Sequence, residues 1–200
     1  MRRLDWMARG LAAAVVVIGG AAPAAVAEVR QADTPAARAA QRPAPAPVVV
    51  TLSHLHHVAK REIELGMLAQ VAAVRPETMA FAAELETSFR ALDKRVVALA
   101  EAFGIEENRL RLAYAADNTD ALRRQAQALD RLSVTRGQDF DRQFWVTIGQ
   151  VHLVASDLLA PAFGAAGADR RVDSLVVEMV LLLDQSSRKA IAAAAAMNRP

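Results

Sequence analysis

The chain has 200 residues, with 24 Lys or Arg against 22 Asp or Glu and no cysteine. The lack of cysteine excludes disulfides, thiol nucleophiles and cysteine-ligated metals. The nearly balanced charge and the aromatic content of 4% do not supply the basic patches and stacking surfaces that nucleic acid requires, so we expect no nucleic-acid partner.

Residues 1–27 are predicted to be a secretory signal peptide. A basic start with Arg2 and Arg3 precedes an apolar run over residues 11–22, and Ala25-Val26-Ala27 matches an A-x-A cleavage site. We therefore expect a mature protein that begins at Glu28 and resides in the periplasm or cell envelope. The apolar run is shorter than the ~20 residues of a membrane span, so no transmembrane helix is expected in the mature chain. Retention of the segment as an N-terminal anchor is the alternative.

Residues 28–47 are predicted to form a disordered linker. They are rich in Ala and contain prolines at Pro35, Pro43, Pro45 and Pro47. Alternating Ala and Pro favours extended polyproline geometry and opposes a helix. The following residues, 48–197, are numerous enough for one helical domain.

Five segments of this domain have apolar residues spaced by three and four, which is typical of amphipathic helices. The predicted helices cover residues 49–74, 76–103, 120–132, 138–160 and 171–197. Pro76, Gly104 and Pro161 mark boundaries, because proline is tolerated only in a first turn and glycine readily ends a helix. Residues 105–117 fit either an irregular crossover or a short helix. The predicted fold is an all-α up-down bundle of four long helices plus one short helix.

The last predicted helix, Arg171–Met197, is apolar almost all round in its first half. A helix of this kind lies either at the centre of a bundle or in a contact between subunits. The sequence is therefore compatible with a homo-oligomer that forms through this helix.

Residues 54–73 contain three of the four histidines and two closely spaced carboxylates. At about 100° per residue, Glu62 lies at the edge of the apolar face and Glu64 lies on a polar stripe. We expect Glu62 to be buried and Glu64 to be exposed. A buried carboxylate needs a partner, and Arg95 is one candidate. Gly66 in the helix interior costs about 1 kcal/mol relative to Ala, which indicates close approach by another helix.

A carboxylate–histidine metal site is the first functional candidate for such a bundle. Di-iron bundles use a Glu on each of two helices and Glu-x-x-His on each of the other two. The weak candidates for metal ligands are Glu62, Glu86 and His152. Phe89 stands three residues after Glu86, and Gly149 stands three residues before His152, so neither Glu-x-x-His motif is complete. We therefore expect no tightly bound metal and no other cofactor.

The three histidines near the start of the domain resemble a metal cluster. His54 and His57 are one turn apart on the polar side and are predicted to be a surface pair, either solvated or weakly bound to Zn²⁺ or Cu²⁺. His56 points to the apolar side, so a regular helix does not bring all three to one ion.

Three motifs follow one another along the chain. Residues 62–69 read EIELGMLA, residues 81–85 read FAAEL, and residues 140–144 read FDRQF with His152 further on. In this order, behind a signal peptide, they resemble the exported bacterial family catalogued as domain of unknown function 4142, whose fold is ferritin-like. The resemblance covers residues 52–159 well and the last helix poorly.

The resemblance implies a ferritin-like fold but names no activity, because the function of the family is unknown. Ser88 and Phe89 stand where the family carries Asp-His, and Ser186 and Ser187 stand where the last helix usually carries a His. The resemblance therefore implies that any polar or metal site of the family is incomplete in this chain.

These observations favour an exported, non-enzymatic helical bundle that acts as a binding or stress-associated module. Nucleophilic catalysis has no support, since the sequence contains neither G-x-S-x-G nor a glycine-rich phosphate loop. The alternative is a ferritin-like metal-binding protein or oxidoreductase, in which an incomplete site at Glu62 and His152 holds iron or zinc.

Overall fold

The computed structural model describes residues 45–111, 119–162 and 169–197. The chain divides into two compact units, 1–34 and 35–200, and all of these residues belong to the second. The predicted signal peptide, most of the predicted linker and part of the ambiguous segment 105–117 lie outside the described residues. Within the described ranges, no helix is long and apolar enough to cross a membrane.

All five predicted helices are present, and their ends differ from the predicted ends by at most three residues. They are α2 (Ala46–Ala72), α3 (Pro76–Ala102), α5 (Thr119–Ser133), α6 (Gly137–Leu159) and α7 (Arg170–Met197), with the 3-10 turn η1 (Ala160–Ala162) after α6. Residues 107–111 are also helical. α2 begins inside the predicted linker, because Pro47 lies in its first turn, where a proline has no intrahelical N–H to lose.

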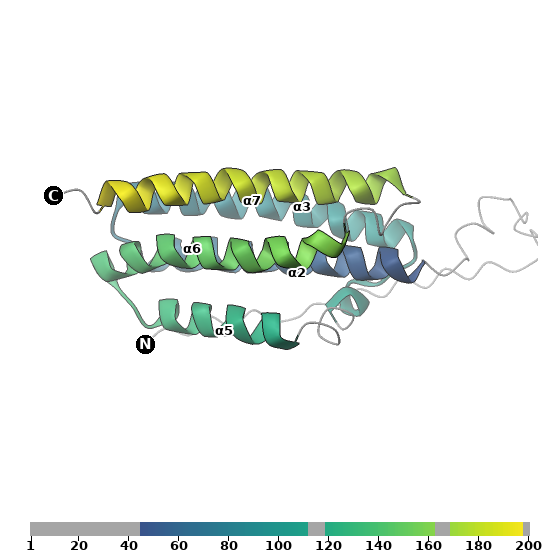
Figure 1. Ribbon diagram of the computed structural model, residues 1–200, viewed down its shortest axis with the longest axis horizontal. Helices are drawn as coiled ribbons and strands as arrows, with labels where there is room; N and C mark the ends of the chain where they lie inside the picture. Colours follow the sequence, from purple (N-terminus) through teal and green to yellow (C-terminus); the bar gives the residue numbers. More distant parts are fainter. Residues whose placement is uncertain (1–44, 112–118, 163–168, 198–200) are drawn as a thin grey trace, which may run out of the picture. The chain divides into compact units, whose positions relative to one another are not determined.

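The four long helices pack as an up-down bundle, and α5 runs along one side of it (Figure 1). α2 packs on α3 and α6 packs on α7, and these two hairpins meet through contacts of α2 with α6 and of α3 with α7. α5 packs against α6 and returns the chain to the end of the bundle where α6 begins. The connection from α3 to α6 therefore places one extra helix over the bundle.

An aromatic cluster joins α3 to α6. Phe81 on α3 contacts Phe144 and Trp145 on α6, with ring centroids 6.1 and 4.8 Å apart. Phe140 stacks on Phe144 at 5.9 Å, and all four rings are buried. Aromatic side chains bury large apolar areas and have preferred mutual orientations. The first and last residues of the FDRQF motif thus belong to the core.

Asp141, the second residue of that motif, is buried and caps the turn between α2 and α3. Its Oδ2 atom accepts the backbone N–H groups of Val74 at 3.3 Å and of Arg75 at 3.2 Å. These donors stand just before α3, where unpaired N–H groups and the helix dipole favour a negative charge. The carboxylate therefore ties α6 to the connection between the first two helices of the bundle.

α3 ends just before Gly104, which acts as the predicted stop. The φ of Gly104 is 69°, in the left-handed region that favours glycine. The N–H of Ile105 donates to Ala100 at 2.9 Å, and the N–H of Gly104 donates to Glu101 at 2.8 Å. This pair of bonds is a Schellman motif, and the burial of Ile105 supplies its apolar contact.

The apolar residues of α7 separate into a buried and an exposed stripe. The buried ones are Val172, Leu175, Val176, Met179 and Leu183. Val177, Leu181 and Ile191 are 49%, 62% and 68% exposed in the single chain. An exposed apolar stripe is compatible with a contact between subunits, and the homo-oligomer through this helix stays a prediction.

Gly66 lies where α2 and α3 approach closely. A Cβ atom at this position would lie 2.8 Å from the carbonyl oxygen of Ala82 and 3.0 Å from the Cβ atom of Glu86. Both neighbours are fixed by the backbone of α3, so they do not move aside without a shift of the whole helix. The predicted close approach of another helix at Gly66 is confirmed.

We expect Gly66→Ala to lower the free energy of unfolding by about 1–3 kcal/mol, because overpacking outweighs the ~1 kcal/mol gained in helix propensity. Gly149→Ala on α6 is the matched control, since nothing lies within 4 Å of a Cβ atom there. The control is expected to stabilise the protein by up to about 1 kcal/mol. Urea unfolding of both variants measures the difference; equal stabilisation by both would contradict the close packing at Gly66.

Candidate functional site

Glu62 on α2 and His152 on α6 form a buried pair. The Nε2 atom of His152 lies 3.0 Å from Oε2 of Glu62, and the two residues are 2% and 0% exposed. The second ring nitrogen, Nδ1, lies 2.9 Å from the hydroxyl of Ser187 on α7. A carboxylate only accepts, so Nε2–H donates to Glu62, while Nδ1 is hydrogen-bonded to the Ser187 hydroxyl. The result is a polar line across three helices.

The prediction that Glu62 is buried and Glu64 exposed is confirmed, but the expected partner of Glu62 is wrong. Arg95 is exposed and pairs with Glu178 of α7 at 2.5 Å. The partner is His152, which the sequence suggested only as a weak candidate for a metal ligand. α6 and α7 together cover this part of α2, so the imidazole is enclosed.

The line of an acid, an imidazole and a hydroxyl has the same groups as a nucleophilic triad. Ser187 is half-buried in the interior of α7, where the neighbouring N–H groups are bonded within the helix and form no oxyanion hole. The Oε1 atom of Glu62 has no hydrogen-bond partner among the described residues. The line is therefore better described as a polar tie between helices than as a hydrolytic site.

A second buried pair lies on the other side of α2. The Nδ1 atom of His56 is 2.7 Å from Oδ1 of Asp93 on α3. Its Nε2 atom is 3.7 Å from Glu107, and Lys60 is 3.9 Å from the other oxygen of Asp93. His56 is 1% exposed, as its predicted position on the apolar side requires. This cluster joins α2, α3 and the helical turn at 107–111.

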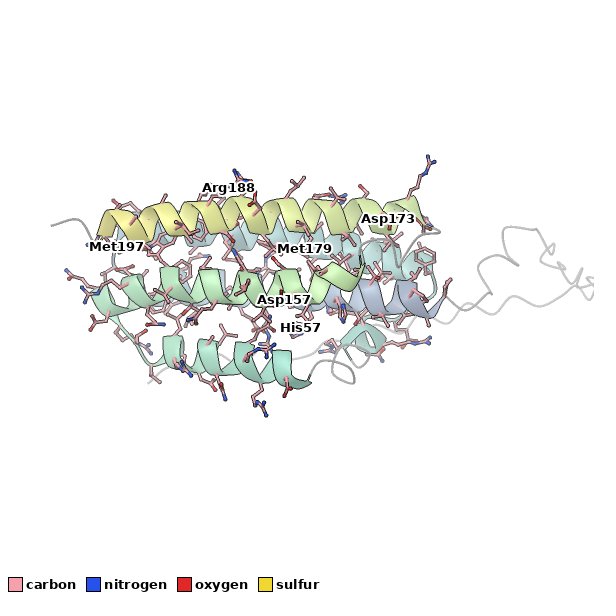
Figure 2. All side chains as sticks on the ribbon, viewed as in Figure 1. His57, Asp157, Asp173, Met179, Arg188 and Met197 are labelled. Atoms are coloured by element: carbon pink, nitrogen blue, oxygen red, sulfur yellow. The ribbon has the colours of Figure 1, made fainter. Side chains whose placement is uncertain are left out.

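The predicted surface pair of His54 and His57 is wrong. His54 is buried, and His57 is partly buried with its Nε2 atom 2.8 Å from the Oε1 atom of Gln125 on α5. Figure 2 shows His57 in the space between α2 and α5. The sequence did not show that α5 returns over this face and covers it. Burial lowers the pKa of His57 to about 4, although the bond to Gln125 acts in the opposite direction.

Glu86, the third weak candidate for a metal ligand, belongs to a separate cluster near the surface. It accepts hydrogen bonds from Arg90 and Gln70, which lower the pKa of its carboxyl group. Of the three candidates, the structure brings together only Glu62 and His152. Within the described residues, no group of three or more acidic or histidine side chains is arranged to hold a metal ion.

At two positions where the family pattern has a His, this chain has Phe89 and Ser187, and the structure shows what each side chain does instead. Phe89 stands where the resemblance implies a His, and its side chain is fully buried in the core. Ser187 stands near the position where the last helix usually carries a His, and its hydroxyl hydrogen-bonds to His152. One departure is therefore apolar packing, and the other keeps a polar partner for the buried imidazole.

Sequence reasoning missed Asp93, Asp141 and Gln125 as buried polar residues. Asp93 and Asp141 stand directly beside core residues, Leu92 and Phe140, and each lies on the buried side of its helix. An acidic residue inside a core stripe is the signal that points to such a pair. Gln125 carried a similar signal, because it stands three residues before Ala128, four before Leu129 and seven before Leu132, on the apolar stripe of its helix.

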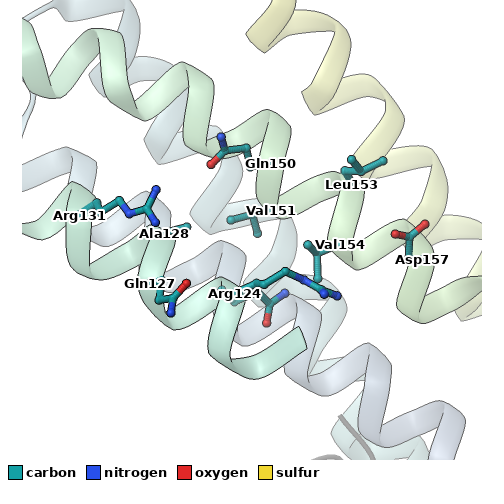
Figure 3. A pocket seen from close by; sticks show the side chains of 10 residues that line it. Arg124, Gln127, Ala128, Arg131, Gln150, Val151, Leu153, Val154 and Asp157 are labelled. Carbon is teal, nitrogen blue, oxygen red and sulfur yellow. The ribbon is translucent and has the colours of Figure 1, made fainter. Parts of the chain in front are cut away.

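A groove lies between α5 and α6 (Figure 3). It has a volume of about 460 Å³, within the usual range of small-molecule sites. Val151, Val154 and Ala128 contribute apolar surface, and Arg124 and Arg131 contribute positive charge. Gln125 also lines the groove while its side-chain oxygen is bonded to His57. The groove therefore combines an apolar lining with charged and neutral hydrogen-bond donors.

We expect His152→Leu to lower the free energy of unfolding by about 3–5 kcal/mol, because Glu62 then remains buried without a donor. Glu62→Met with His152→Leu is expected to cost less than the sum of the single changes, since both polar groups are removed together. Urea unfolding of the two single variants and the double variant measures the coupling. The exposed pair Arg95–Glu178 is the control and should show little coupling. Additive losses at Glu62 and His152 would contradict the buried pair.

The lowered pKa of His57 predicts a loss of stability in mild acid. Its pKa falls from 6.5 to about 4 on folding, so the unfolded chain binds more protons between these pH values. The contribution of His57 is complete above about pH 6.5 and is lost as the pH falls toward 4. Between pH 7 and 4.5, the wild type is expected to lose about 2 kcal/mol more than His57→Gln in urea unfolding. Equal losses would contradict a buried, neutral His57.

The comparisons with known proteins agree with this helical architecture. The family model described as a domain of unknown function (DUF4142) matches residues 24–193. No curated protein matches the chain. The chain is similar to the crystal structure of a DUF305 fragment from Deinococcus radiodurans, with a TM-score of 0.64 and 14% identity, over 77% of this chain and 99% of that chain. At this identity the similarity concerns the fold alone. Because the family model covers most of the chain, the protein belongs to the DUF4142 family.

Proposed function

We propose that the protein is an exported helical-bundle module of the periplasm or cell envelope that acts by binding, without catalysis. The predicted signal peptide at residues 1–27 supports export. The long connection between the two helix hairpins supports the ferritin-like relationship that the sequence resemblance implies. A stress-associated role is compatible with such a module.

The observation that carries this proposal is the groove between α5 and α6. Its volume of about 460 Å³ is that of a small-molecule site, and its lining mixes apolar side chains with unused donors. Gln125 is 2% exposed, and its Nε2 atom has no hydrogen-bond partner among the described residues. A buried donor without an acceptor costs about 1–3 kcal/mol, which an oxygen atom of a ligand in the groove would offset.

The buried acids and histidines support a role without catalysis. Glu62 and His152 bond to each other, and His56 bonds to Asp93, so these groups serve to join helices. A general acid or base has to reach a substrate proton, directly or through one water. Glu62 and His152 are 0% and 2% exposed, which leaves a substrate no path to them in this packing.

The alternative function, a metal-binding protein or oxidoreductase, is favoured by one observation. Glu62 and His152 are in contact, and the Oε1 atom of Glu62 is unpaired among the described residues. A carboxylate and an imidazole are ligands that iron and zinc accept. Stoichiometric iron or zinc in the purified protein, abolished by Glu62→Ala, would favour this alternative.

The binding proposal is tested with protein recovered from the envelope fraction, whose N-terminal sequence is expected to begin at Glu28. The neutral fluorescent probe N-phenyl-1-naphthylamine should bind saturably, with one site per chain. Gln150→Trp on the rim of the groove should weaken binding about tenfold or more by filling the site. Gln138→Trp on the same helix is the control, because Gln138 is exposed and does not line the groove.

Two results would contradict the proposed function. One is the absence of saturable probe binding, and the other is an equal effect of the two tryptophan substitutions. Recovery of the protein with an intact Met1 in the membrane fraction would contradict cleavage after Ala27 and leave the binding proposal in place.

A further inference from the structure

The charge around the α5–α6 groove is unequal. Arg124 and Arg131 stand one heptad apart on α5 and both line the groove, whereas Asp157 is its one acidic lining residue. Among the described residues, neither guanidinium forms an ion pair, although the neighbouring Arg123 pairs with Asp120. Two cations against one anion leave the groove with a net positive charge. The complementary ligand carries a single negative charge.

The two arginines lie in different surroundings. Figure 3 shows Arg131 and Gln150 toward one end of the groove and Arg124 and Asp157 toward the other. This order follows from the antiparallel run of α5 and α6. The acidic residue therefore partly balances Arg124, and the end near Arg131 has no acid among the residues that line the groove.

His57 determines which atoms of Gln125 are available to a ligand. The His57 ring donates from Nε2 to the amide oxygen of Gln125, because that oxygen only accepts. The amide Nε2 atom of Gln125 remains as a buried donor without a partner in the described part of the chain. His57 is thus a positioning residue that leaves an N–H group for an acceptor in the groove.

We propose that the occupant of this groove is a small organic carboxylate, with its apolar body on Val151 and Val154 and its carboxylate within reach of the arginines and the Gln125 amide. This inference rests on the binding function proposed above and names its ligand class. A carboxylate accepts several hydrogen bonds and pairs with guanidinium groups. The apolar lining between the charged ends accounts for the body of the ligand.

Competition against N-phenyl-1-naphthylamine tests the ligand class. Phenylacetate should displace the probe at a concentration about tenfold lower than its neutral counterpart phenylacetamide, because only the former makes charge-assisted bonds. Acetate has the charge without the apolar body and should displace the probe poorly. Equal displacement by phenylacetate and phenylacetamide would overturn the carboxylate proposal while leaving the binding function in place.

Substitutions that each remove one positive charge test whether the preference for phenylacetate arises in the groove. Arg131→Gln and Arg124→Gln should each reduce the preference for phenylacetate, and Gln125→Leu should weaken phenylacetate more than the probe. Arg123→Gln is the control, because it removes the same charge from the same helix outside the groove lining. An equal loss of preference in Arg123→Gln would overturn the proposed site, since it would reflect only the net charge of the protein.

A second copy of the chain is the competing occupant of the groove. Sedimentation at several protein concentrations distinguishes the two cases. A concentration-dependent dimer that Gln150→Trp abolishes would overturn the proposal, and a monomer that binds phenylacetate would support it.

Discussion

The bundle depends on the enclosure of α2, a helix whose sequence is unusually rich in titratable side chains for a buried position. α3, α6 and α7 pack against it, and α5 reaches it through Gln125. A buried polar group without a hydrogen-bond partner lowers the free energy of unfolding by an amount that is large compared with the net stability of a domain. Glu62, His56 and His57 on α2 therefore each have a partner on another helix, and the partners specify how the helices assemble.

The partners come from three separate helices. His152 on α6 hydrogen-bonds to Glu62. Asp93 on α3 hydrogen-bonds to His56, and Gln125 on α5 hydrogen-bonds to His57. Because such pairs tolerate little displacement, they oppose the sliding of one helix along another, which apolar packing alone resists weakly. Gly66 adds a steric requirement, since α3 lies against the backbone of α2 at that point. Polar pairing and close packing thus act together on the same helix.

This enclosure also separates the chemistry of the core from that of the surface. The acids and histidines that first invite a catalytic interpretation are occupied in joining helices. The groove between α5 and α6 has the opposite character, because its arginines and the Gln125 amide have donors to spare. His57 connects the two regions, since it is partly buried between α2 and α5 and orients a residue of the groove. A ligand in the groove would therefore contact Gln125, a side chain that is also hydrogen-bonded to the bundle through His57.

The helices and their ends could be predicted from the sequence, because apolar spacing, Pro76 and Gly104 act within one segment of chain. The orientation of α2 about its axis was predictable for the same reason, so Glu62 was expected inside and Glu64 outside. The sequence could not identify His152 as the partner of Glu62, nor show that His54 and His57 are covered. Those facts depend on which helices become neighbours after a long connection, and the periodicity of a single helix says nothing about its neighbours. The groove was likewise decided by tertiary structure, because its two walls come from α5 and α6. Neither helix shows in its own sequence that the other will pack beside it.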